Sequence, residues 1–274
     1  MDLSGIAFGW AVAVYVAAAF FVIWSHWKGN ENSPPAAWWL TLSGWTALLL
    51  YLGGLVAVQG GLHANFRTSL EMVAFVVGVL LLAGWRWKQQ ETRAAGLLLL
   101  PVVALLLLAS RLLTDPPAPH HPVMGPEVLL HLLLSLLAYG LFTIAAALAL
   151  LDAFQERALR RKELGRLFSL LPPLSQIEER LFNVAGWGFV LLSFSIATGA
   201  VVSHQTLGTW FTLSHKVVFT WATWLVFGTL LWGRHRYGWR GRRAVRFTLF
   251  GYFFLMLGFL GVKFVTEVLL HRAG

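Results

Sequence analysis

The sequence predicts an all-α membrane protein with eight transmembrane helices. Of its 274 residues, 58% are hydrophobic and only 12% are charged, whereas soluble domains average about 45–50% apolar and about 25% charged residues. Eight apolar stretches are long enough to cross a bilayer, and basic residues concentrate in alternate connections. These observations exclude a disordered chain and an ordinary soluble enzyme. The absence of cysteine from the sequence excludes disulfides, thiolate metal sites and thiol redox chemistry.

The eight stretches follow one another with short connections. A membrane-spanning helix needs about 20 mostly apolar residues. Stretches of this kind occupy residues 6–24, 37–58, 70–85, 94–110, 128–151, 182–202, 215–232 and 247–270. The connections between them are too fragmented for a separate soluble domain, so the whole chain, 1–274, is predicted to form a single integral membrane domain.

Positive charge predicts the orientation. Sixteen of the 21 Lys and Arg residues lie in the connections after the first, third, fifth and seventh stretches. The opposite side carries Arg67, Arg111 and Arg272, whereas Lys216 and Lys263 lie within or at the ends of stretches. Because cytoplasmic loops carry an excess of Lys and Arg, both termini are predicted on the outer, periplasmic side of a bacterial inner membrane. The basic loops are interpreted as topology determinants that contact lipid headgroups and not nucleic acid.

Seven of the nine histidines are predicted at or near the outer side, where basic residues are rare. Histidine is a common ligand of metal ions and of haem iron near neutral pH. Four histidines lie at helix ends that antiparallel packing would bring to one level: His131, His204, His215 and His271. A histidine at a helix end also often bonds only a headgroup or a backbone carbonyl, so both interpretations stay open.

Residues near these histidines suit a flat apolar ligand. Trp210, in the short connection between the sixth and seventh stretches, could stack on such a ligand. Lys263, Glu267 and His271 are spaced by four residues and share one helix face, so Glu267 could accept the second ring N–H of His271. Zinc is disfavoured because no helix carries a His-x3-His or Glu-x-x-His pair.

Five segments stand in order on this topology. They are a His131-led helix opening at 131–139, a small-residue helix exit at 198–201, a tryptophan-rich region containing Gly208, Lys216 and residues 221–224, a turn at 238–244, and a closing helix at 260–271 that ends in His271. Together they resemble the cytochrome c assembly family of haem-handling membrane proteins. The resemblance divides the domain into two accessory spans, residues 1–60, and a family-like core from about 61 to 272. The accessory spans resemble the eight-span branch typified by HemX and YpjD.

The resemblance implies a non-covalent b-type haem at the outer face, with His131 and His271 as axial ligands of the iron and Glu267 supporting His271. Further candidate cofactor contacts are His204, His215, Trp210 and Lys216. The family's Trp-Gly-x-x-Trp-x-Trp-Asp signature is incomplete, because residues 207–216 keep one tryptophan and lack the aspartate. This departure favours haem binding, sensing or regulation over haem transfer.

The predicted function is therefore haem handling in cytochrome c biogenesis or haem homeostasis. The protein need not be an enzyme, and at most it presents haem within a cytochrome c synthetase system. Expected partners are membrane lipid and other cytochrome c assembly proteins or an apocytochrome c. The alternative is a non-haem membrane scaffold or a regulatory subunit of a transporter. A transporter in its own right, using Glu71, Lys263 and Glu267, ranks last because Pro101 is the only proline inside a predicted span.

Overall fold

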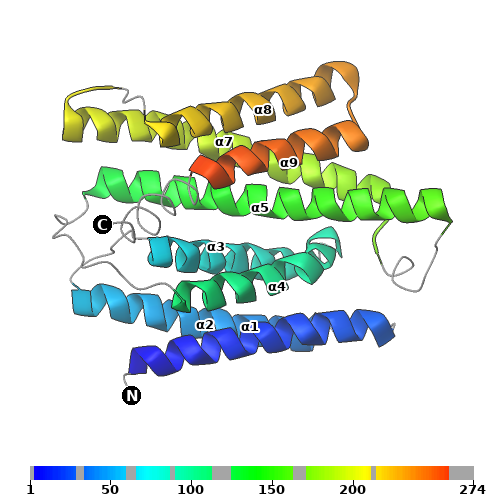
Figure 1. Ribbon diagram of the computed structural model, residues 1–274, viewed down its shortest axis with the longest axis horizontal. Coiled ribbons are helices and arrows are strands. Elements are labelled where there is room, and N and C mark those ends of the chain that lie inside the picture. The colour runs from blue at the N-terminus through cyan, green and yellow to red at the C-terminus, as the bar shows by residue number, and fades with distance from the viewer. Residues whose placement is uncertain are drawn as a thin grey trace.

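The chain folds into a bundle of roughly parallel helices (Figure 1). The computed structural model describes residues 3–28, 34–59, 66–86, 90–112, 125–162, 171–210 and 214–258. Its helices are α1 (Leu3–Lys28), α2 (Pro34–Gln59), α3 (Phe66–Arg86), α4 (Gln90–Arg111), α5 (Pro126–Arg161), α7 (Leu174–Leu207), α8 (His215–Tyr237) and α9 (Arg242–Met256). Seven of the helices in the described residues are long and apolar enough to cross a membrane. This confirms the predicted all-α membrane class.

The last predicted span, 247–270, is described only in part. Helix α9 begins at Arg242, and helical backbone continues as far as Gly258. Lys263, Glu267 and His271 lie outside the described residues. An eighth span and the sidedness of the termini therefore remain predictions.

Helix α5 lies between α1–α4 on one side and α7–α9 on the other (Figure 1). It packs most extensively against α7 and also contacts α3, α4 and α9. Successive helices run in opposite directions, so α1, α3, α5 and α8 all begin at the same end of the bundle (Figure 1). This up-and-down order brings residues that are distant in the sequence to one level.

Several helices extend beyond the apolar stretches that predicted them. Helix α5 continues past residue 151 to Arg161, and α7 covers Leu174–Leu207 where the prediction was 182–202. Hydropathy marks only the part of a helix that suits lipid, whereas helical backbone continues into water when polar side chains support it. In α5 this support includes the Arg160 guanidinium, which lies 2.7 Å from Glu156 Oε1 one turn earlier.

Proline and glycine limit α7. The helix begins directly after Pro172 and Pro173, which fits because proline lacks the N–H that a helix interior needs but suits a helix start. It ends where Gly208 adopts φ +70° and its N–H bonds the His204 carbonyl at 3.0 Å. The predicted connection at 203–214 therefore begins only at Gly208, and His204 lies on the helix rather than in a loop.

Aromatic packing joins α5, α8 and α9 in the interior. The rings of Phe142 and Phe227 are fully buried and stack with 3.9 Å between centroids. A Cβ at Gly251 would lie 2.7 Å from Phe227 Cε2, so glycine allows α9 to approach this ring closely. Within lipid, such close packing of small against large side chains supplies much of the attraction between helices.

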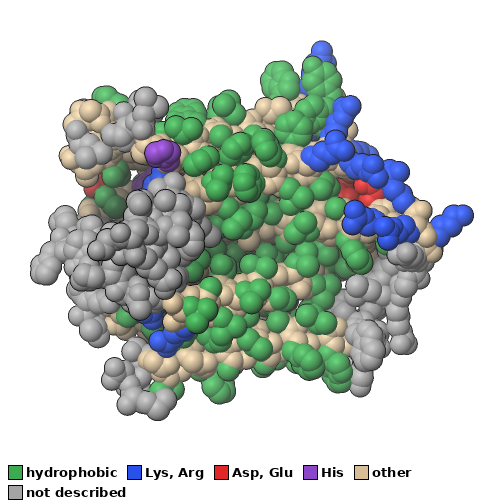
Figure 2. All heavy atoms as spheres, in the orientation of Figure 1, with side chains coloured by type: hydrophobic (Ala, Val, Ile, Leu, Met, Phe, Trp, Pro, Cys, Tyr) green, Lys and Arg blue, Asp and Glu red, His purple; other side chains and the backbone are tan. Residues whose placement is uncertain are grey.

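The surface divides into an apolar middle and a basic end. Figure 2 shows hydrophobic side chains over the middle of the bundle and Lys and Arg gathered at one end. Exposed basic residues from the ends of α5, α8 and α9 form this basic end: Arg157, Arg160, Arg161, Lys162, Arg236, Arg240, Arg242, Arg243 and Arg246. The described parts of the connections after the fifth and seventh stretches, which the charge pattern predicted to be cytoplasmic, thus lie together at the end opposite the start of α5 (Figure 1).

A buried carboxylate links α2, α3 and α4. Glu71 is fully buried, and its Oε1 accepts hydrogen bonds from the Tyr51 hydroxyl at 3.3 Å and the Ser110 hydroxyl at 3.2 Å. Arg67 Nε lies 3.3 Å from the same oxygen, and Arg67 Nη2 donates to the Tyr51 hydroxyl at 3.1 Å. This network favours a structural role for Glu71 over the role in transport that the last-ranked hypothesis gave it.

We expect a Glu71→Ala variant to lose about 3 to 5 kcal/mol of stability, because it breaks a buried ion pair and removes the acceptor of the Tyr51 and Ser110 hydroxyls. Reversible unfolding by a denaturing detergent would measure the loss. Glu179→Ala, at an exposed position of α7, is the matched control and should stay within about 0.5 kcal/mol of the wild type. Equal stability of the two variants would contradict the structural role.

Candidate functional site

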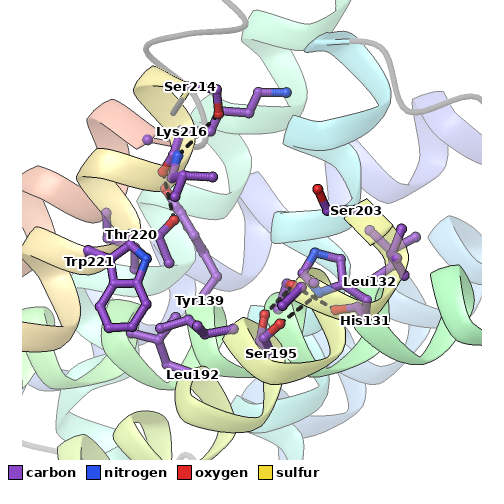
Figure 3. Close-up of a pocket in the computed structure, with 18 of the residues that line it drawn as sticks. His131, Leu132, Tyr139, Leu192, Ser195, Ser203, Ser214, Lys216, Thr220 and Trp221 are labelled. Atoms are coloured by element: carbon purple, nitrogen blue, oxygen red, sulfur yellow. Dashed lines mark hydrogen bonds between the residues drawn. The ribbon is translucent and has the colours of Figure 1, made fainter. Parts of the chain in front are cut away.

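A cavity of about 630 Å³ lies between α5, α7, α8 and α9 (Figure 3). Residues from the start of α5 and α8 and from the end of α7 line it, which places it at the end of the bundle away from the basic surface. The lining combines aliphatic and aromatic side chains with several hydroxyls. Its volume falls within the range of about 300–1,000 Å³ that is typical of small-molecule sites.

Helix α5 presents His131, Ser135 and Tyr139 to the cavity. These residues are spaced by four and therefore share one face of the helix. Pro126 occupies the first turn of α5, where its fixed backbone angle is favourable and its missing N–H costs nothing. Helix α5 therefore begins before His131, and the His131 side chain extends from regular helical backbone.

Helix α7 holds the His131 ring through one nitrogen. Nδ1 lies 2.9 Å from the Ser195 carbonyl oxygen and 3.4 Å from the Thr198 hydroxyl. Because a carbonyl oxygen can only accept, Nδ1 carries the hydrogen, and Nε2 of the neutral ring keeps its lone pair. Nε2 makes no hydrogen bond to any described residue. Histidines that bind metal commonly show this pattern, in which the second nitrogen donates to a carbonyl or carboxylate.

Small residues make room for this ring. A Cβ at Gly199 would lie 2.9 Å from His131 Cε1, which is closer than real side chains approach. The Ser135 hydroxyl donates to the His131 carbonyl at 2.6 Å and lies 2.7 Å from the Ser195 hydroxyl. Together these contacts fix α5 against α7 at His131. The small-residue helix exit at 198–201 is visible in the sequence, but no residue pattern marks Gly199 or Ser195 as a neighbour of His131.

Two of the other candidate histidines lie beside the cavity. Trp210 lines it, and its ring stacks on His204 with 4.2 Å between centroids and 27° between planes. His204 and His215 are exposed, and neither belongs to the described lining. Of the four histidines predicted to converge, only His131 therefore lines the cavity in the described part of the chain. His271 lies outside the described residues.

Helices α8 and α9 complete the wall. Lys216 and Trp221 line the cavity from α8, and Leu255 and Gly258 line it from α9. Tyr139 is buried, and its ring lies 6.1 Å from that of Tyr252 on α9. The predicted contacts Lys216 and Trp210 thus share one cavity with His131. Glu267, the predicted neighbour of His271, lies outside the described residues.

The sequence matches the family model described as Cytochrome C assembly protein over residues 39–270. The chain belongs to the cytochrome c assembly family. The match covers all of the described cavity lining, from His131 on α5 to Gly258. It also covers all of α3 and α4 and most of α2, whereas α1 precedes it.

Several family relatives are similar in sequence. An uncharacterised 28.8 kDa protein of Azospirillum brasilense is 33% identical over 233 residues, which covers 82% of this chain and 86% of the relative. The inner membrane protein YpjD of Escherichia coli K12 is 35% identical over 144 residues, which covers 53% of this chain and 54% of YpjD. The cytochrome c biogenesis protein CcsA of Prochlorococcus marinus is 36% identical over 87 residues, or 32% of this chain and 28% of CcsA.

The fold is also found in a solved structure, that of the cytochrome c haem lyase CcmF. The two chains superpose with a TM-score of 0.71 at 14% sequence identity. The match covers 98% of this chain and 49% of the lyase, so this chain spans about half of the lyase's length. At this identity the likeness establishes a shared fold.

Proposed function

We propose that this protein holds a non-covalent b-type haem in the cavity, with His131 Nε2 as an axial ligand of the iron. One observation carries the proposal: the bond from His131 Nδ1 to the Ser195 carbonyl fixes the tautomer that leaves Nε2 available to a metal. Membership of a family named for cytochrome c assembly, and a fold shared with a haem lyase, support haem as the ligand.

The lining fits such a group. Trp210 and Trp221 provide flat apolar surfaces, and aromatic rings stack well on planar apolar ligands. Bound haem would supply an iron centre with a ligand position for imidazole. The residues of this chain orient that imidazole through Ser195 and Gly199. The aliphatic part of the wall is supplied by Leu132, Leu192, Ile196 and Leu255.

We propose His271 as the second axial ligand, with Glu267 accepting its other ring N–H. Its support is that Leu255 and Gly258, near the end of the described chain, line the cavity, and that His271 follows Gly258 by 13 residues in the sequence. His204 and His215, which lie beside the cavity, are the substitutes if His271 does not serve.

We further propose eight spans with both termini on the periplasmic side of a bacterial inner membrane. The gathering of exposed Lys and Arg at the end opposite the cavity supports this orientation. Residues 1–60 form two accessory spans on a core from about 61 to 272. The partners are other assembly proteins or an apocytochrome c at the outer face. The incomplete tryptophan signature favours holding or sensing haem over transferring it.

Purification in mild detergent, followed by a reduced-minus-oxidised spectrum and a pyridine haemochrome assay, tests the proposal. We expect about one b-type haem per chain, bound on isolation or after incubation with haemin. A protein that stays colourless with excess haemin would refute haem handling and would favour the non-haem scaffold or regulatory subunit.

A further inference from the structure

The cavity has one cationic side chain and no anionic one in its described lining. Lys216, at the start of α8, is the only described lining residue that carries a charge at neutral pH, and none of those residues is Asp or Glu. No carboxylate of the described residues forms an ion pair with Lys216. Ionisable residues at the edge of a membrane span generally pair with another group or take part in ligand binding.

Hydrogen bonding distinguishes the hydroxyls of the lining. Ser203, Thr206 and Thr220 each donate their hydrogen to a backbone carbonyl, at 2.8, 2.7 and 2.8 Å. Ser214 differs, because its oxygen accepts from the Val217 N–H at 3.4 Å and its hydrogen has no acceptor among the described residues. Among the hydroxyl and ammonium groups in this part of the cavity, those left to donate to a ligand are therefore the Lys216 ammonium and the Ser214 hydroxyl.

Figure 3 shows Ser214 and Lys216 together, apart from His131 and Ser195. The cavity thus provides a metal-ligating nitrogen at His131 and, at a separate position, two hydrogen-bond donors at Ser214 and Lys216. A carboxylate can accept from an ammonium and a hydroxyl together, and both hydrogen bonds are then charge-assisted and stronger than neutral ones. A ligand that binds both His131 and the pair Ser214 and Lys216 has a metal ion in a flat apolar ring system and an acidic side chain at the edge of that ring system.

We infer that Lys216 and Ser214 bind a carboxylate of the ligand, so that the site selects metal tetrapyrroles with free acid side chains over their esters. The inference rests on the proposed function, because it uses the same cavity and His131. It assigns Lys216 a role in specificity, which differs from the common role of a lysine at a helix end, where the ammonium only reaches the lipid headgroups.

Titration of the haem-free protein in detergent micelles tests the inference. Ferric protoporphyrin IX and its dimethyl ester would be added separately and followed by absorbance, with protein-free micelles as the blank. We expect the free acid to bind at least about tenfold more tightly than the ester, because a hydrogen-bonded charge contributes about that factor. Equal affinities in the wild type would overturn the inference while leaving haem binding intact.

Variants assign the preference to its residue. Lys216→Met should lose most of the preference while its affinity for the ester stays unchanged, and Lys216→Arg should retain the preference. Arg111→Met is the matched control, because Arg111 ends α4 and does not belong to the described lining. An unchanged preference in Lys216→Met would overturn the assignment and indicate a lysine that reaches only headgroups.

Metal-free protoporphyrin IX separates this inference from the proposed function. Its binding, followed by porphyrin fluorescence, involves no iron ligand and should depend on Lys216 but not on His131. A His131→Ala variant should therefore keep its preference for the metal-free acid over the metal-free ester while binding both iron compounds weakly. Failure of the wild type to bind any of these compounds would refute the proposed function and this inference together.

Discussion

A His131→Ala variant is expected to bind haem more than about 100-fold more weakly than the wild type. Loss of a residue that merely orients a metal ligand typically lowers affinity by about 10–100-fold, and loss of the ligand itself should exceed this. His131 is the histidine whose ring lines the cavity and whose Nδ1 is already held by the Ser195 carbonyl. Titration with haemin, followed in the Soret region, would measure the effect.

Substitution of the neighbouring histidines and rescue by imidazole test whether the effect is specific to ligand loss at His131. His204→Ala and His215→Ala remove exposed histidines that do not line the cavity in the described structure, so we expect each to change haem affinity by less than the His131 substitution does. Added imidazole should partly restore the haem spectrum of His131→Ala, because a small base can occupy the space that the side chain leaves. A normal Soret band in His131→Ala without imidazole would contradict the assignment of His131 as a ligand.

A Gly199→Ala variant is expected to weaken haem binding by about 10–100-fold without removing any ligand atom. The added Cβ would lie 2.9 Å from His131 Cε1 and 3.2 Å from Nδ1, so the ring must move or α7 must shift away from α5. Either movement lengthens the bond from Nδ1 to the Ser195 carbonyl and changes the direction of Nε2. Haemin titration, together with the position of the Soret band, would report the altered ligation.

The matched control for Gly199→Ala lies on the same helix. A Cβ at Gly186 would meet nothing within 4 Å, so Gly186→Ala tests the general effect of alanine in α7. We expect Gly186→Ala to bind haem as the wild type does and to be slightly more stable, since alanine favours helix. Equal haem affinity in both variants would show that the contact between Gly199 and His131 does not position the ligand.

Much of the fold could be predicted from the sequence because hydrophobicity and length are properties of each segment alone. All eight apolar stretches coincide with described helices, although 247–270 is described only as far as Gly258. The predicted helix ends were less accurate, because capping residues outside the lipid determine where a helix stops, and hydropathy does not detect them. Helix α7 continues to Leu207 and stops at a left-handed glycine, so His204 lies on a helix next to Trp210.

By itself, the sequence determined the membrane class and the approximate place of each helix, since both follow from composition along one segment, and it predicted a group of histidines on the outer side. Only the tertiary structure decided which histidine of the described residues lines the cavity and which of its nitrogens is available. The partner of His131 is the Ser195 carbonyl, 64 residues away. A backbone carbonyl is present at every residue, so no residue type marks it in the sequence, and only the packing of α5 against α7 selects it.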